Sequence, residues 1–387
     1  MKAADFDGSS SGRLVLTDKS QPAFVPNPLP PAIDLGKVAE KLATASQLLG
    51  ELNGIGRTLT DPLLLIRPLQ VREALTSSSM EGTYTTLDEL LLVDAGGPET
   101  DSSGDTREVS NYRRALATAI ESLDTLPLSL RTLRDAHRTL LEGVRRHRGM
   151  SARPGEFKTH QNFIGAREIE TARFVPPPPA EALQCLSDLE KYIHRDYRGG
   201  IPDLIDSALI HYQFETIHPF ADGNGRVGRM LIPLHLFVRG ALREPILYLS
   251  PSLEQRKDEY IDRMFAVSQR GAWLDWIAFF LSVVSDACGS AIATADALLA
   301  LQRDYRSRAT GAGRSSNLLA IIDHLFRTQI VTIPSVAALL SVQYRSAQLN
   351  IEALVSVGIL AEIEGTSNPK YFVAREIRDV INKSLMH

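Results

Sequence analysis

A chain of 387 residues is too long for one ordinary hydrophobic core, so its length predicts two or three domains. With 44% hydrophobic and 23% charged residues, no uninterrupted apolar run of membrane-spanning length and no signal peptide, we expect a cytoplasmic protein without membrane contact. The net charge of −4 excludes a general attraction to nucleic acid, and two cysteines without a CxxC pattern favour buried thiols over a disulfide or metal site.

The first hundred residues predict a tail, an extended segment and three helices. Residues 1–20 are polar and predict a mobile tail, whereas the prolines of 24–31 predict an extended segment across the surface. Apolar residues at helical spacing then predict a helix over 35–52, a second within 61–82 and a short third over 87–93.

The middle of the chain predicts a helical bundle interrupted by a hairpin. Aromatic and β-branched runs around a polar turn predict a β-hairpin within 154–175, and 246–249 has the composition of a strand. The remaining segments have helical periodicity, namely 107–123, 129–145, 180–194, 203–216, 225–239, 252–269 and 272–306.

The end of the chain predicts a winged helix-turn-helix after a linker at 310–313. Three helices over 317–327, 333–340 and 343–357 precede two strands over 359–364 and 371–373, which is the order of that fold. From Arg314 onward, Lys and Arg exceed Asp and Glu by only one, and the expected recognition helix offers little beyond Arg345. Counterion-driven affinity needs several cations together, so DNA binding is not expected and protein contact or homodimerisation is favoured.

One stretch, reading HPFADGNGRVGR over 218–229, combines a base, a carboxylate, glycines and two arginines. His218 follows an apolar helix and could take a proton from an attacking hydroxyl, or could be a histidine satisfied within the fold. Asp222 could be a turn residue or a ligand for a phosphate-bridging Mg²⁺. The local sequence leaves both pairs of roles open.

The glycines and arginines of this stretch predict a phosphate site. Gly223, Gly225 and Gly228 allow backbone amides to approach a ligand where a helix begins and points its positive end. Arg226 and Arg229 share one face of its first turn, where two guanidinium groups can hold successive phosphates.

The stretch resembles the signature of Fic-domain proteins at every defining position, and the resemblance covers most of residues 20 to 380. It implies a mainly α fold: a Fic helical bundle with a small β-hairpin flap, followed by the winged helix domain. The implied division is a flexible tail (1–20), an N-terminal region with an inhibitory helix (21–104), a catalytic core (105–309) and the winged helix domain (314–387).

By this resemblance the chain is a protein adenylyltransferase, which transfers AMP from ATP to Tyr, Ser or Thr hydroxyls of a target protein. His218 would be the general base, Asp222 would hold Mg²⁺, and Phe220 would anchor the loop. The implied nucleotide-binding residues are Glu81, Gly223, Asn224, Gly225, Arg226, Val227, Gly228, Arg229 and Tyr260. Of these, Arg226 would contact the transferred and bridging phosphates, and Arg229 would clamp the terminal one. The flap at 159–174 would dock the target by main-chain pairing.

Residues 77–82, reading SSSMEG, resemble the inhibitory pattern of Fic proteins, in which Ser or Thr is followed four residues later by Glu. Ser77 and Glu81 fit that spacing. Glu81 could pair with Arg229 and occupy the guanidinium group that should hold the γ-phosphate.

Two other functions stay open at this point. Glu81 could align a water that removes AMP from a modified target, which would make the protein a deAMPylase or a bifunctional enzyme. Alternatively, the Fic domain could sense nucleotide for a DNA-binding regulator, although the charge count argues against strong DNA binding.

Overall fold

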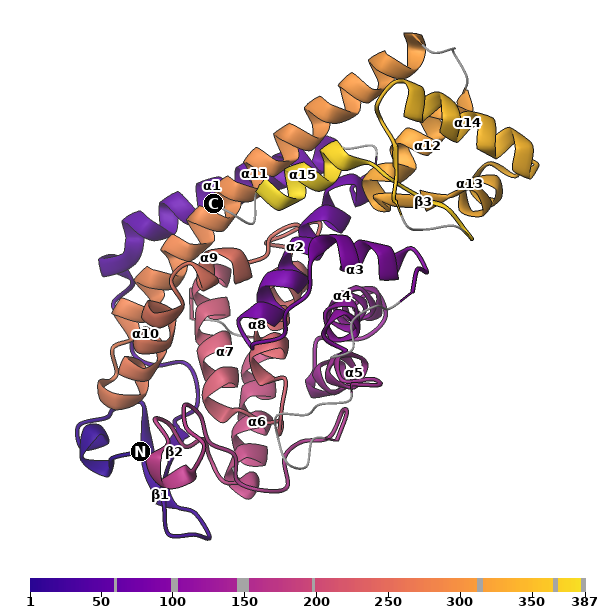
Figure 1. Cartoon of the computed structure of the whole chain (residues 1–387). Coiled ribbons are helices and arrows are strands. Elements are labelled where there is room, and N and C mark those ends of the chain that lie inside the picture. The colour runs from indigo at the N-terminus through magenta and orange to yellow at the C-terminus, as the bar shows by residue number, and fades with distance from the viewer. Residues whose placement is uncertain are drawn as a thin grey trace.

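The computed structural model describes residues 1–58, 61–98, 104–144, 153–196, 199–311, 316–364 and 368–383, and this part of the chain is mainly helical (Figure 1). Its helices are α1 (Ala39–Thr58), α2 (Leu63–Ser79), α3 (Leu87–Asp94), α4 (Asp105–Ser122), α5 (Leu130–Leu140), α6 (Pro179–Ile193), α7 (Asp203–Ile217), α8 (Asn224–Val238), α9 (Ser250–Glu254), α10 (Lys257–Arg270), α11 (Trp273–Gly311), α12 (Ser316–Arg327), α13 (Ile333–Leu340), α14 (Tyr344–Ser356) and α15 (Arg375–Lys383). Short 3₁₀ turns cover Ala3–Phe6, Leu35–Val38 and Ile169–Thr171.

Two small antiparallel sheets complete the described part. The first pairs β1 (Gly12–Leu16) with β2 (Pro22–Pro26), and the second has the order β3-β5-β4, from β3 (Ile330–Thr332), β4 (Ala361–Glu362) and β5 (Tyr371–Val373).

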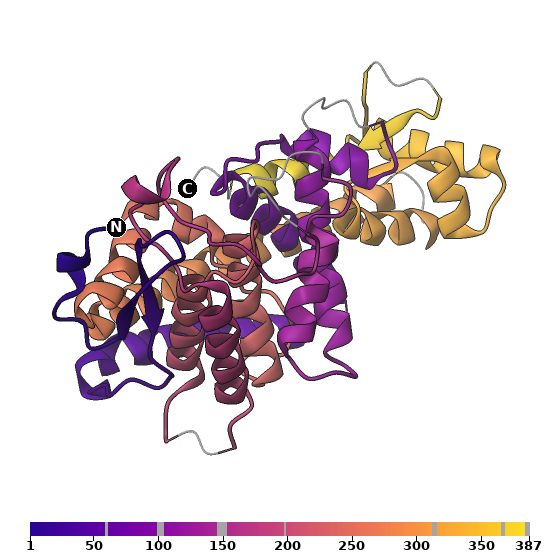
Figure 2. The same ribbon diagram turned by 90° about the horizontal axis from the view of Figure 1, so that it is seen from below.

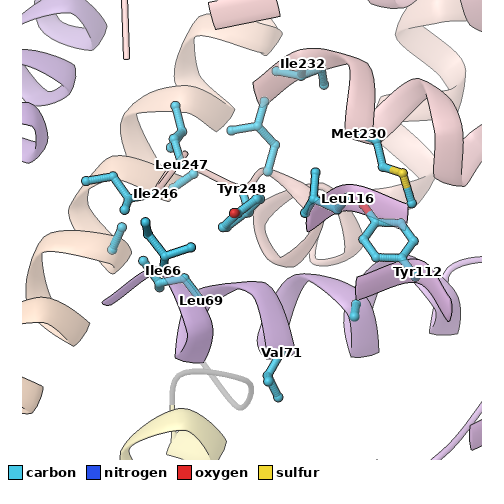
Figure 3. Close-up of a cluster of buried hydrophobic side chains, with 14 of the residues drawn as sticks. Ile66, Leu69, Val71, Tyr112, Leu116, Met230, Ile232, Ile246, Leu247 and Tyr248 are labelled. Atoms are coloured by element: carbon cyan, nitrogen blue, oxygen red, sulfur yellow. The ribbon is translucent and has the colours of Figure 1, made fainter. Parts of the chain in front are cut away.

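The centre of the bundle is the pair α7 and α8, which carries the 218–229 loop between its two helices. Almost all residues of α7 are buried, including polar ones such as His211 and Gln213, because other elements surround this helix. Helices α2 and α4 pack against α8. Figure 3 shows this core, in which α2, α4, α8 and the segment before α9 contribute Ile66, Leu69, Tyr112, Leu116, Met230, Ile232, Ile246, Leu247 and Tyr248.

The long helix α11 joins the two ends of the molecule (Figure 1). Near its start Trp276 is fully buried and donates its Nε1–H to the carbonyl oxygen of Ala208 in α7, at 3.0 Å. By length and composition alone, Trp273–Thr310 could also cross a membrane, although Asp275 and Asp286 interrupt its apolar run. Of its most apolar window 56% is buried within the protein, and the core helix of a soluble protein meets the same test.

The N-terminal residues are ordered where we predicted a mobile tail. β1 pairs with β2 over five residue pairs, and Phe6 lies with Phe24 and Phe174 in an aromatic cluster. In Figure 2 this hairpin lies at the end of the molecule opposite α12, α13 and α14. A single buried aromatic residue and one strand pairing are enough to order a segment whose average composition is polar.

Three further predicted elements differ from the structure. The predicted hairpin within 154–175 reduces to one β-bridge, between Ile164 and Phe174. The strand predicted over 246–249 is irregular, and the helix predicted over 252–269 is two helices, α9 and α10. These short apolar segments are buried by tertiary contacts, and burial alone does not distinguish a strand from an irregular segment.

A linker is predicted at 310–313, but α11 continues to Gly311, and residues 312–315 lie outside the described residues. The elements from α12 to α15 follow in the order helix, strand, two helices, two strands, helix. They contact the rest of the molecule through α2 and α11, and both α12 and α15 pack against each of these helices. Arg327 of α12 donates to Asp61 just before α2, at 2.7 Å, and Arg378 of α15 lies 3.5 Å from Asp88 of α3.

Candidate functional site

The loop between α7 and α8 presents His218 to a cavity. His218 directly follows α7 with left-handed backbone angles, φ 50° and ψ 61°. Such angles are uncommon outside glycine and persist only where the surroundings hold them, as often happens at functional sites. Asn162 holds the loop here, because its Nδ2–H donates to the carbonyl oxygens of His218 and Phe220, at 2.9 and 3.0 Å.

His218 is held as a neutral imidazole with a free ring nitrogen. Its Nδ1 lies 3.2 Å from the carbonyl oxygen of Glu215, which can only accept, so Nδ1 carries the proton. Burial and the nearby Lys158 lower the pKa of His218 to about 4. Its Nε2 is therefore available as a proton acceptor at neutral pH.

Phe220 and Asn224 fix the shape of the loop. Phe220 is fully buried and stacks on the ring of His137, with the ring centres 3.8 Å apart. The Oδ1 of Asn224 accepts from the amide of Phe220 at 2.7 Å, and its Nδ2–H donates to the carbonyl oxygen of Phe220 at 2.8 Å. The side chain of Asn224 therefore closes the loop, and only its backbone is left to face a ligand.

The glycines of the loop are needed for close packing. Gly223 has φ 77° and precedes α8. A Cβ on Gly225 would meet the Glu81 carboxylate, and a Cβ on Gly228 would meet Oε1 of Glu215. Because Gly225 has no side chain, the backbone at the start of α8 borders the cavity directly.

Replacing Gly228 by alanine is expected to destabilise the fold. The added Cβ would meet the Glu215 carboxyl group and would lie 3.1 Å from the ring of the fully buried Phe214, and overpacking of this kind costs about 1–3 kcal/mol. The melting temperature by calorimetry should fall accordingly. Gly289, in α11, has no atom near the position of its Cβ, so Gly289→Ala is the matched control and should leave the melting temperature unchanged or raise it. Equal effects of the two substitutions would contradict the clash.

Arg229 in α8 contacts the end of α2. Its Nε donates to the Ser77 hydroxyl, and its Nη2 donates to the Ser77 carbonyl oxygen and to Oε1 of Glu81, each at 2.8 Å. The Arg229 side chain is only 3% exposed. Burial alone would raise the pKa of Glu81, but Arg229, helped by Arg226, holds it below its usual value. Both partners are therefore charged.

The end of α2 is also tied to the opposite side of the cavity. Lys257 donates its Nζ–H to the carbonyl oxygen of Met80 at 2.6 Å, and the Ser79 hydroxyl donates to Oε1 of Glu254 at 2.6 Å. These bonds fix the turn that carries Glu81.

Arg226 lies in the core, whereas the motif predicts that it contacts a triphosphate. It is fully buried and forms an ion pair with Glu108 of α4, and its Nη2 lies 3.7 Å from Oδ1 of Asp222. Val227, also predicted to bind nucleotide, is fully buried in the hydrophobic core. The physical reason is the position of α4, whose carboxylate meets the guanidinium group of Arg226.

Five of the predicted site residues line one cavity of about 260 Å³: Glu81, His218, Gly225, Arg229 and Tyr260. An apolar wall completes it, made of Met80, Ile164, Phe174, Ile261, Met264 and Phe265. Of the predicted flap, Ile164, Arg173 and Phe174 reach the cavity. The structure thus brings α2, α8, α10 and the 164–174 segment together around His218.

Tyr260 joins the cavity to the start of α8 through a buried histidine. The carbonyl oxygen of Gly228 accepts from Nδ1 of His211 at 2.9 Å, so Nε2 of His211 accepts from the Tyr260 hydroxyl at 2.8 Å. Burial lowers the pKa of His211 to about 3 and raises that of Tyr260, so both stay neutral. Tyr260 is therefore held rigidly at the cavity wall.

The residues that sequence reasoning missed are charged groups brought in by packing. Glu108 pairs with Arg226, Lys158 influences His218, and burial raises the pKa of Glu215 to about 8. Oε1 of Glu215 has no hydrogen-bond partner among the described residues. Of these three residues, only Glu215 could have been found from the sequence, because a residue three positions before His218 lies next to it at the same helix end.

Asp222 is the only carboxylate of the loop. Its Oδ1 accepts from the amide of Gly223 at 2.7 Å. In the part of the chain that the structure describes, no group of three or more His, Cys, Asp or Glu side chains could hold a metal ion. A single carboxylate fits a Mg²⁺ that is carried mainly by substrate phosphates, and it does not form a cage of its own.

Family models match two adjacent segments of the chain. The Fic/DOC family N-terminal model matches residues 39–121, and the Fic/DOC family model matches residues 127–236. The first segment holds Glu81, and the second holds the whole 218–229 loop. These are the two segments that meet at Arg229.

Curated relatives are similar over a shorter stretch. The protein adenylyltransferase Fic of Drosophila willistoni is 30% identical over 107 residues, 28% of this chain and 19% of that protein. That of Drosophila melanogaster is 27% identical over 116 residues, 30% of this chain and 20% of that protein. The chain thus matches about a fifth of the length of these relatives.

Solved structures share the fold. A Fic family protein from Desulfovibrio desulfuricans G20 has a TM-score of 0.57 at 18% identity, covering 89% of this chain and 98% of that one. Fic-1 from C. elegans has a TM-score of 0.51 at 19% identity, covering 66% of this chain and 73% of that one. These likenesses show a mainly helical Fic fold, and the family models place residues 39–121 and 127–236 of the chain in the Fic/DOC family.

Proposed function

We propose that this protein is an adenylyltransferase that transfers AMP from ATP, with Mg²⁺, to a hydroxyl side chain of a target protein. The observation that carries the proposal is the shared cavity: a neutral histidine and a buried arginine, His218 and Arg229, face one space at the start of α8. Proton acceptor and phosphate-binding cation are the two groups that in-line transfer of a nucleotidyl group requires.

The geometry supports the following proposed roles. Nε2 of His218 takes the proton of the attacking hydroxyl, because Nδ1 already donates to Glu215. Arg229, the N-terminus of α8 and the amide of Gly225 stabilise the charge of the polyphosphate. Asp222 would hold Mg²⁺, which supplies charge neutralisation on the phosphates when bound. The apolar wall next to Tyr260 is suited to the adenine base.

Glu81 occupies the Arg229 guanidinium group in this arrangement, and we infer that it inhibits the forward reaction. A carboxylate 2.8 Å from Nη2 of Arg229 competes with a terminal phosphate for the same donor and repels its charge. The same carboxylate faces the cavity and could align a water for removal of AMP, so a bifunctional enzyme is the second candidate.

The proposed reaction is tested by intact mass. The purified protein and its Glu81→Gly variant are incubated with ATP and Mg²⁺, and an added AMP on either chain supports nucleotidyl transfer. No added mass on either chain, with ATP binding intact, would contradict it. Removal is tested with a modified target, from which wild type but not Glu81→Gly should release AMP.

The rate of transfer is expected to be nearly independent of pH in the neutral range. Burial and Lys158 lower the pKa of His218 to about 4, and the base is active only when unprotonated, above that pKa. The initial rate of Glu81→Gly should therefore stay level from about pH 8 to about pH 5.5 and fall below that. An acidic fall centred near the ordinary histidine pKa would show that His218 is not held as described.

The C-terminal elements are proposed to form a winged helix that contacts protein, as a homodimer or with another chain. Tyr344 and Leu349 of α14 are 57% and 51% exposed, and Arg345 bonds to Gln348 of the same helix. Apolar exposed side chains suit a protein surface better than a phosphate backbone. A salt-dependent shift of DNA in a mobility assay would contradict this. The target protein is proposed to dock along 159–174.

A further inference from the structure

A second cavity lies where α12 meets the helix that carries Glu81 at its end. It has a volume of about 320 Å³, and no described residue lines both this cavity and the one around His218. Three arginines line it: Arg67 of α2, Arg113 of α4 and Arg327 of α12. Cations from three separate helices converge on one space.

Two of these arginines have acidic partners. Nη2 of Arg113 lies 2.8 Å from Oδ2 of Asp94, and Nε of Arg327 donates to Oδ2 of Asp61 at 2.7 Å. Among the described residues that line the cavity, Asp94 is the only carboxylate. Asp61 and Asp94 therefore neutralise two of the three arginine charges, and one positive charge remains.

Arg67 is the cation that no described residue contacts by a hydrogen bond. It forms no hydrogen bond or ion pair with any residue of the described ranges, although its side chain is only half-exposed. The positive charge of Arg67 acts on Arg113: burial and Arg67 both lower the pKa of Arg113, whereas Asp94 raises it. Burial raises the pKa of Asp94, whereas Arg113 and Arg67 both lower it, so these two cations share one carboxylate.

The remaining lining groups can complete an anion site. Burial and Arg327 lower the pKa of His324, so its imidazole is neutral and can donate one hydrogen bond. Thr328 and Gln329 add polar groups beside it. Guanidinium groups bind phosphate oxygens in pairs, and a volume of this size admits a small molecule.

We propose that this cavity binds the phosphate group of a small molecule, with Arg67 as its principal ligand. Such a ligand would bridge α2 and α12, and so would connect the C-terminal elements with the helix that directly precedes Glu81. The site is independent of the proposed AMP transfer, since it shares no lining residue with the cavity around His218.

The proposal is tested by calorimetric titration of the full chain with inorganic phosphate and with ribose 5-phosphate. Arg67→Gln should weaken binding roughly tenfold or more. Arg67→Lys keeps the positive charge but loses the paired donors of the guanidinium group, so its affinity should lie between those of wild type and Arg67→Gln. Arg345→Gln, an exposed arginine of α14, is the matched control and should bind like wild type. Circular dichroism shows that each variant is folded.

The two probes separate the possible sources of the phosphate. Tighter Arg67-dependent binding of ribose 5-phosphate indicates an organic phosphate, and equal binding indicates free phosphate. Wild type that binds neither probe at about 10 mM, or Arg67→Gln that binds both as well as wild type, would overturn the site.

Discussion

Replacing Glu81 by glycine is expected to raise AMP transfer to the protein itself by about tenfold or more, since each 1.4 kcal/mol of released inhibition is tenfold. The substitution releases the one hydrogen bond that Nη2 of Arg229 donates to the Glu81 carboxylate, and it removes a negative charge from the cavity. Arg229 stays in place, because its Nε and Nη2 still bond to Ser77. The measurement is the initial rate with ATP labelled at the α-phosphate.

Two companion variants separate charge from shape. Glu81→Gln keeps the size of the side chain but loses the charge, so it should raise the rate by less than Glu81→Gly. Ser77→Ala leaves the Glu81 carboxylate on Arg229 and removes only the hydroxyl that accepts from Nε, so it should not activate. Activation by Ser77→Ala equal to that by Glu81→Gly would mean that loosening of α2, and not the carboxylate, controls the rate.

The local signals of the sequence predicted the helices well where apolar periodicity was long. α7, α8 and α11 lie close to their predicted bounds, because each is a long helix with buried residues along its length. The first helix exceeded its predicted end: Asn53 reads as a stop, yet α1 runs to Thr58. The side chain of Asn53 instead donates to the carbonyl oxygen of Ala241 and accepts from the amide of Arg243, at 2.7 and 3.1 Å.

The site was predictable as far as residues are neighbours in the chain. His218, Gly225 and Arg229 lie within one loop and helix turn, and they do face one cavity. The environment of Arg226 was not predictable, because Glu108 lies 118 positions away and is brought there by the packing of α4 on α8. The same holds for Lys158, whose effect on the pKa of His218 depends on the fold of the 153–164 segment.

Removing the imidazole of His218 is expected to lower transfer by Glu81→Gly by about 10²–10⁴-fold, the usual contribution of a positioned general base. Alanine at a position with φ 50° adds backbone strain, so His218→Asn is the second variant, since asparagine tolerates left-handed angles. Both should lose activity alike. His194→Ala, an exposed histidine at the end of α6, is the matched control and should keep full activity.

ATP affinity distinguishes a base from a binding residue. In the geometry described, Nδ1 of His218 bonds to the carbonyl oxygen of Glu215 and Nε2 stays free, whereas the phosphate-binding cation is Arg229. His218→Asn should therefore bind ATP as tightly as its parent while the rate of transfer falls. A loss of affinity that matches the loss of rate would assign His218 to nucleotide binding. An unchanged rate in His218→Asn would exclude His218 as the base, and another group would then have to accept the hydroxyl proton.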